Sequence, residues 1–189
     1  MKPIYSICML AGLAIAAGSA AAQHLTITVQ AQKQGLFRGE IALKYGNAKA
    51  EGRTELLDVR YEMESPRDPA TGFASGRRVH KPLTIVKRFG PSSPQYLQAL
   101  STNETLPQVL IEGFNADRQG QLRPAFTIKL INASVSHVDS RVAPTPNPAG
   151  RSGAATADDM QEVIQFTYQG IEVSSQIGKT MFADSWNRQ

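Results

Sequence analysis

The sequence predicts a mainly β protein: an antiparallel β-barrel of six to eight strands with one short flanking α-helix. Apolar and polar residues alternate in segments such as 25–30, which reads Leu-Thr-Ile-Thr-Val-Gln. This period of two places one face of a strand in a core and the other face in water. Several short runs separated by Gly, Pro and Asn favour a sandwich or a barrel. Closure into a barrel would remove the exposed edges that promote aggregation.

The expected strands share apolar residues at every second position or a short apolar run between turn signals. They lie at 25–30, 57–63, 83–86, 106–114, 126–135, 164–168 and 171–173.

One segment, 92–100, departs from this rhythm and predicts a helix. It begins with two serines and a proline, so that a hydroxyl group precedes a proline at the first helical position, where the missing N–H costs nothing. Tyr96, Leu97 and Leu100 then follow at helical spacing. We expect a short amphipathic helix whose apolar side covers one end of the barrel.

The first 22 residues have the pattern of a cleavable signal peptide. Lys2 precedes an apolar run at 7–17, and Ala20 and Ala22 occupy the small-residue positions that signal peptidase requires. We therefore expect a bacterial protein that is secreted or periplasmic and whose mature chain begins at Gln23. The alternatives are an uncleaved anchor or a misassigned start codon, although the run is short and rich in Ala and Gly for a transmembrane helix.

The mature chain, 23–189, is expected to be a single domain without disulfides. The only cysteine, Cys8, lies in the predicted signal peptide, so no cysteine is left for a disulfide, metal or redox site. The chain carries 20 Lys and Arg against 16 Asp and Glu. These charges are interleaved, and the basic clusters at 77–81 and 87–88 lack the stacking aromatics of a nucleic-acid surface. We expect neither a nucleic-acid partner nor, after signal removal, a membrane partner.

No residue pattern predicts catalysis, a metal or a cofactor. His24, His80 and His137 are far apart in the sequence and lack the spacing that places two metal ligands on one face. No serine lies in a Gly-x-Ser-x-Gly elbow. We predict that the protein is not an enzyme. One alternative is a hydrolase in which acids such as Glu62 and Glu112 meet across the barrel.

Two stretches are predicted to be mobile loops. Residues 64–78 contain two prolines, two glycines and mixed charge, and they lie between two expected strands. Residues 143–159 are rich in Pro, Ala, Gly and Ser. Loops of this length in compact domains are either functional or disordered, and both possibilities stay open for 64–78.

The order of the elements resembles that of the Hcp family, the tube proteins of bacterial type VI secretion. For example, 80–87 is similar to the family's strand of the form histidine-x-proline-apolar-threonine-apolar-x-lysine. The resemblance extends from residue 30 to residue 186, and each piece of it is degenerate. The similar pieces, in order, are 35–40, 80–87, 92–100, 126–135, 162–171 and 183–186.

The resemblance implies a subunit that assembles head to tail into a ring, usually hexameric. The rings stack into a tube that is expelled and that carries small effector proteins in its lumen. The implied partners are other copies of this chain, other secretion-system components and effectors. The loop at 64–78 would then contact the neighbouring ring. The residues implied in ring stacking are Glu64, Ser65, Pro66, Arg67, Asp68, Pro69, Gly72, Phe73, Arg77 and Arg78.

Two features depart from the family's pattern. Its tube proteins normally lack a signal peptide, and the segment 143–159 resembles an insertion before the last hairpin. A second hypothesis is therefore an exported binding module of the same fold that is monomeric or assembles differently.

Overall fold

The structure is a computed structural model that describes residues 23–41, 53–117, 119, 121–142 and 160–186. The predicted signal peptide, 1–22, and the predicted mobile segment, 143–159, lie outside the described residues. In the part of the chain that the structure describes, no helix is long and apolar enough to cross a membrane.

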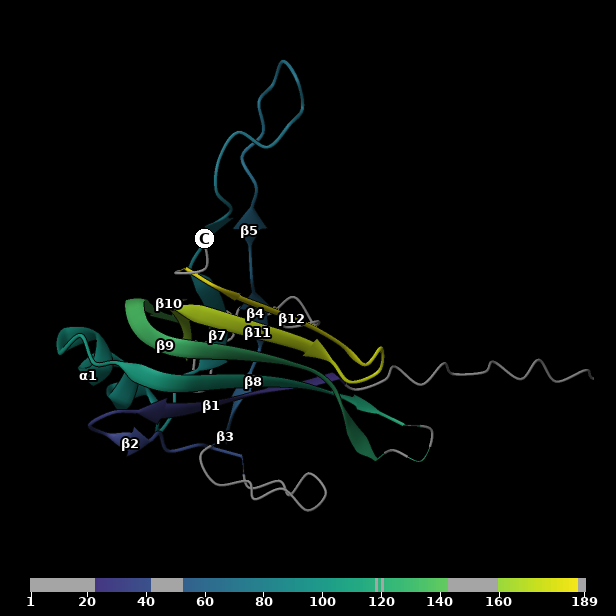
Figure 1. The fold of residues 1–189 in the computed structure, drawn as a ribbon. Coiled ribbons are helices and arrows are strands. Elements are labelled where there is room, and N and C mark those ends of the chain that lie inside the picture. The colour runs from purple at the N-terminus through teal and green to yellow at the C-terminus, as the bar shows by residue number, and fades with distance from the viewer. Residues whose placement is uncertain (1–22, 42–52, 118, 120, 143–159, 187–189) are drawn as a thin grey trace, which may run out of the picture.

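Twelve strands and one helix make up this part of the chain (Figure 1). The strands are β1 Gln23–Ala31, β2 Gly35–Leu36, β3 Arg53–Leu56, β4 Asp58–Arg60, β5 Met63–Glu64, β6 Val79–His80, β7 Leu83–Arg88, β8 Leu106–Ala116, β9 Leu122–Val142, β10 Met160–Thr167, β11 Gly170–Ser175 and β12 Thr180–Ser185, and the helix is α1 Ser93–Ser101.

Ten of the strands form one antiparallel sheet. Its main path runs β2-β1-β8-β9-β10-β7-β4, with β3 beside β1 and with β11 between β9 and β12. The long strand β9 organises this arrangement, because its C-terminal half pairs with β10 and its N-terminal half pairs with β11. β10 and β11 are consecutive in the chain and pair with consecutive parts of β9.

The mainly β class with one short helix is confirmed, whereas the sheet differs from the expected barrel in two details. The main sheet contains ten strands instead of six to eight, because it also includes β2, β3 and β12, which the sequence pattern did not predict. The run expected at 57–63 is divided between β4, which lies in this sheet, and β5, which lies outside it. The hydrogen-bonded path also stays open. β3 pairs with β1, and β4 pairs with β7, but Leu57 interrupts the strand between them.

The core lies inside the curled sheet and under α1. Tyr96 and Ala99 of α1 face the core, and the Tyr96 ring contacts Phe37 and Phe166 edge to face, with ring centroids 5.0 and 6.2 Å apart. Edge-to-face contacts of this kind are favourable because the positive edge of one ring meets the negative face of the other. The core strands contribute Ile27, Val29, Leu83, Ile85, Val109, Ile111, Leu130, Ile164 and Phe166.

The helix begins at Ser93, one residue before the proline that was expected at its first position, and its first turn is held differently. Ser92 makes no side-chain capping bond. Instead, the Ser93 Oγ atom accepts hydrogen bonds from the backbone N–H of Gly90 and from Lys87 Nζ, each at 2.9 Å. Leu97 was expected on the apolar side, yet it is exposed to solvent.

Candidate functional site

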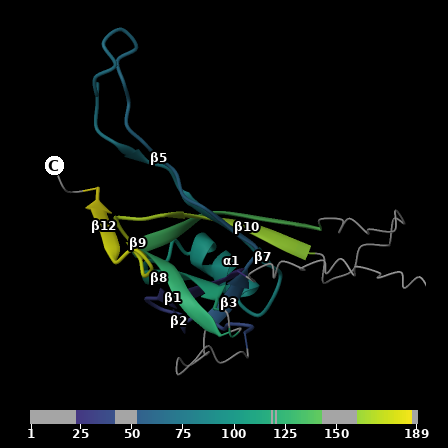
Figure 2. The same cartoon turned by 90° about the vertical axis from the view of Figure 1, so that its right-hand side faces the viewer.

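The segment predicted to be a loop, 64–78, forms most of a β-hairpin that projects away from the sheet (Figures 1 and 2). We call residues 63–80 the arm. At its base, β5 pairs with β6 through Met63 opposite His80 and Glu64 opposite Val79. Further out, Arg67 and Ala74 form an isolated antiparallel bridge. The two arm strands form a sheet of their own, separate from the main sheet.

A tight turn closes the tip of the arm. The Asp68 Oδ1 atom accepts hydrogen bonds from the N–H groups of Ala70 and Thr71, at 2.7 and 3.2 Å. Aspartate favours turns because its side chain can bond to the following backbone in this way. Gly72 has a φ of 72°, a conformation that glycine adopts without steric cost. The turn presents Phe73, which is 75 % exposed, at the end of the arm.

The arm is fastened to the main sheet at its root, which we define as Arg78, His80 and Asp184. Arg78 donates through Nε and one terminal nitrogen to the two carboxylate oxygens of Asp184, a residue of β12. His80 Nε2 lies 2.9 Å from Asp184 Oδ2. The Asp184 side chain is only 4 % exposed. The Arg78 guanidinium, followed by the hydrogen bonds from His80 and the N–H of Ser185, lowers the pKa of Asp184 well below its usual range against the opposing effect of burial.

Aromatic residues surround the other side of the His80 ring. The hydroxyl groups of Tyr61 and Tyr168 lie 3.4 and 3.3 Å from His80 Nδ1. The Trp186 ring, directly after β12, has its centroid 5.5 Å from that of His80. Burial, reinforced by the charge of Asp184, raises the pKa of Tyr61, and burial raises that of Tyr168. Both tyrosines therefore remain neutral hydrogen-bonding groups.

Strand β12 is an edge strand within the part of the chain that the structure describes, since it pairs only with β11. Its register with β11 is regular from Ser175 opposite Thr180 to Gly170 opposite Ser185. Met181 is 75 % exposed and Phe182 is 42 % exposed. Natural edge strands usually carry a bulge, a proline or a lysine that prevents pairing with another chain. β12 has none of these three, although the inward-pointing carboxylate of Asp184 is a further device of this kind at its C-terminal end. The edge from Thr180 to Ala183 is therefore the part of β12 that is open to pairing with a further strand.

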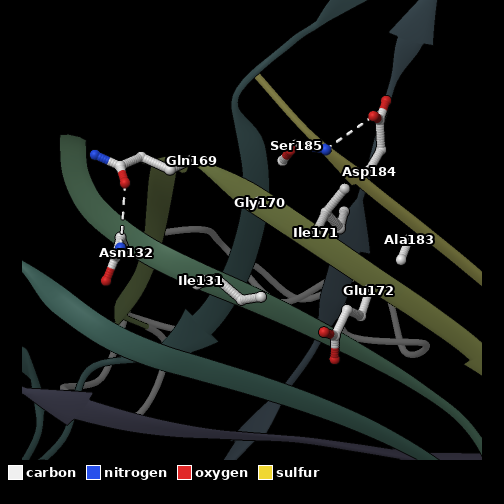
Figure 3. A pocket seen from close by; sticks show the side chains of 9 residues that line it. All are labelled: Ile131, Asn132, Gln169, Gly170, Ile171, Glu172, Ala183, Asp184 and Ser185. Atoms are coloured by element: carbon white, nitrogen blue, oxygen red, sulfur yellow. Dashed lines mark hydrogen bonds between the residues drawn. The ribbon is translucent and has the colours of Figure 1, made fainter. Parts of the chain in front are cut away.

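A cavity of about 300 Å³ lies where β9, β11 and β12 meet (Figure 3). Asp184 and Ser185 line it from β12, and Glu172 lines it from β11. On its β9 side, the Asn132 amide donates to Gln169 Oε1 at 3.1 Å. These groups can hydrogen-bond a ligand.

The structure places all ten residues implied in ring stacking on the arm, and nearly all of them are exposed. Arg78 differs because its side chain points to Asp184. The three histidines are not brought together, and the described residues contain no group of three or more His, Cys, Asp or Glu arranged to hold a metal ion. The acids Glu62 and Glu112 are engaged in ion pairs, with Lys81 and Arg53 respectively.

Sequence reasoning missed the role of Asp184 and treated His80 as an ordinary residue at a strand edge. The two lie 104 positions apart, so no local pattern joins them. The available signal was that both fall in segments that resemble family motifs, 80–87 and 183–186.

Comparison with known proteins gives a consistent result. Residues 34–174 match the family model described as "Type VI secretion system effector, Hcp". The chain is 29 % identical over 165 residues to the "Major exported protein" of Pseudomonas aeruginosa, and the match covers 85 % of this chain and 93 % of that protein.

Solved structures share the fold. A crystal structure of an Hcp protein superposes with a TM-score of 0.72 at 24 % identity, over 87 % of this chain and all of the other. The secreted protein Hcp3 from Pseudomonas aeruginosa gives a TM-score of 0.67 at 23 % identity, over 88 % of this chain and 100 % of the other.

Proposed function

Because this chain belongs to the Hcp family of type VI secretion system proteins, we propose that it is a secreted structural subunit that closes into a homo-oligomeric ring and uses its arm to contact the next ring. The observation that carries this proposal is the arm itself. It is a hydrogen-bonded hairpin that presents an exposed phenylalanine, Phe73, away from the body of the protein. An exposed aromatic side chain on a projecting hairpin suits burial against a partner.

Ring closure requires two different complementary surfaces on each subunit, because the contact is head to tail. Strand β12 supplies one such surface, with an unguarded edge and the exposed side chains of Met181 and Phe182. We expect six subunits in the ring, as the family resemblance implies. Small effector proteins are the cargo that we expect in its lumen, and other secretion-system components are further partners.

The arm and β12 offer contacts in different directions, and this supports two kinds of self-association. Pairing through β12 extends the sheet sideways, whereas the arm projects away from the sheet (Figure 2). A heterologous contact of the first kind closes into a ring when the rotation permits it, and a contact of the second kind adds further rings. The proposal therefore assigns ring closure to β12 and stacking to the arm.

The test is the solution mass of the mature chain, 23–189, by light scattering, together with its N-terminus by mass spectrometry. We expect a ring-sized oligomer that begins at Gln23. A monomer at every concentration would overturn the ring and would favour an exported binding module, for which the cavity beside Asp184 is the candidate ligand site.

The role of the arm is tested with Phe73→Ser. We expect this variant to retain the ring mass and the thermal midpoint of the parent protein and to lose stacked rings in electron micrographs. Leu97→Ser is the matched control, because Leu97 is also an exposed apolar residue but lies on α1. Replacing 65–77 by a short Gly-Ser turn, which keeps Arg78 and the root, should have the same effect as Phe73→Ser. Unchanged stacking in both arm variants would remove the arm from the interface.

A further inference from the structure

Asp184 joins two parts of the molecule that share no β-sheet. The arm strands β5 and β6 form a separate two-stranded sheet, whereas Asp184 belongs to β12 at the edge of the main sheet. Arg78 and His80, both on the returning side of the arm, bond to the same carboxylate. The orientation of the arm is therefore set by side-chain contacts to β12 as well as by the covalent chain.

The contacts at this root are suited to hold one arm orientation. The Arg78 guanidinium meets the carboxylate with two nitrogens, a fork geometry that fixes direction as well as distance. The His80 ring, only 4 % exposed, is packed between the rings of Tyr168 and Trp186, with centroids 5.8 and 5.5 Å away. The arm cannot change its angle to β12 without breaking the ion pair and opening this aromatic cluster.

Within the described residues, β12 is hydrogen-bonded to another strand along one edge only. Beyond the ladder with β11, the next residue, Trp186, donates its N–H to the Gln169 carbonyl at 3.0 Å. Asp184 is the only buried residue among the six residues of β12. The buried carboxylate at the root is therefore a principal tie of the C-terminal end of β12 to the rest of the molecule.

We propose that Asp184 couples the order of edge strand β12 to the order of the arm, so that a second copy pairing with β12 also fixes the arm for the next ring. The second part rests on the proposed function. The physical reason is conformational entropy. A contact that orders β12 also orders the root, so a later contact at the arm loses less conformational entropy than it would on its own. Couplings between two sites in one protein are typically about 5- to 150-fold in affinity.

The coupling itself is tested in dilute monomer by hydrogen exchange of backbone amides. The reporters are the N–H groups of Gly72 and Ser75 in the arm and of Trp186 after β12, each of which makes a backbone hydrogen bond. In Arg78→Gln we expect exchange to accelerate at both ends, by about tenfold. Arg77→Gln is the matched control, because it removes the same charge from an exposed neighbouring position on the arm. Faster exchange in the arm of Arg78→Gln with an unchanged Trp186 amide would overturn the coupling.

The consequence for assembly is tested with Asp184→Asn at concentrations where the parent protein stacks. Because this change also loosens β12, the comparison is made at concentrations where light scattering shows that the variant still forms rings. There we expect the concentration needed for stacking to rise by about tenfold. Stacking at the parent concentration would overturn this part. If the parent protein forms no ring, the proposed function fails, whereas the exchange measurement on the monomer still decides whether Asp184 couples the arm to β12.

Discussion

The Nζ atom of Lys87 lies 2.9 Å from the Oε2 atom of Glu162, and neither side chain is exposed to solvent. The two residues are direct cross-strand partners in β7 and β10. The Ser93 Oγ atom joins them, at 2.9 Å from Lys87 Nζ and 2.5 Å from Glu162 Oε2. This network fastens the first turn of α1 to the sheet.

Removing one partner of this buried pair is expected to destabilise the fold strongly. Lys87→Met leaves the Glu162 carboxylate buried without its counter-charge, which typically costs about 3–5 kcal/mol in the free energy of unfolding. Urea unfolding followed by circular dichroism measures the change. Lys129→Met is the control, because the Lys129–Glu172 pair is 36 and 39 % exposed, and such exposed pairs contribute about 0–1 kcal/mol. Equal losses in the two variants would contradict the assignment.

A charged residue placed on the open edge of β12 is expected to prevent ring closure. Met181→Lys puts an ammonium group on β12, where another strand would have to bury it or displace it. We expect the solution mass to fall toward that of a monomer, with no change in the urea midpoint. Ile177→Lys serves as the control, since Ile177 is equally exposed at 75 % but lies in the turn before β12. A ring that persists in Met181→Lys would exclude β12 from the subunit interface.

The alternation of apolar and polar residues was sufficient to predict the mainly β class. The proline at position 94 placed the start of α1 to within one residue. Local patterns of this kind report on individual elements, because a strand needs one apolar face wherever it lies in the sheet. They say little about where a run is interrupted. Leu57 separates β3 from β4, although nothing in its apolar character distinguishes it from a residue within a strand.

The arm and its root were harder to predict, for different reasons. The arm has only two paired positions at its base and one isolated bridge, so its prolines and glycines dominate the local pattern and indicate a loop. The root depends on contacts between residues that are far apart in the chain. Asp184 lies opposite Ile171 in its own hairpin, and only the three-dimensional arrangement brings Arg78 and His80 to it.

The contribution of the arm root to stability is expected to depend on pH. The Arg78 guanidinium lowers the pKa of Asp184 in the folded state below the unfolded value, which is near 4. The ionised carboxylate therefore stabilises the fold in full above the unfolded pKa, and this contribution is lost as the pH falls toward the folded pKa. The difference in urea midpoint between the parent protein and Asp184→Asn should be larger at about pH 5 than at about pH 3, because the pH falls below the unfolded pKa of the carboxyl group between these values. A difference that is independent of pH over this range would show that Asp184 is not held as an ion.

Close packing between β8 and β9 gives a last expectation, for Gly113. A Cβ atom added at this position would lie 2.2 Å from Cε1 of the Phe126 ring, at the point where the register of the two strands shifts. Gly113→Ala must therefore displace the ring, and overpacking of this kind typically costs about 1–3 kcal/mol in the free energy of unfolding. Gly178→Ala is the matched control, because its nearest neighbouring atom would be 3.4 Å away.

In the double variant Gly113→Ala with Phe126→Leu, the smaller side chain leaves room for the new methyl group. The double variant should therefore lose less stability than the two single changes added together. Strict additivity in urea unfolding would show that the Phe126 ring does not fill the space beside Gly113.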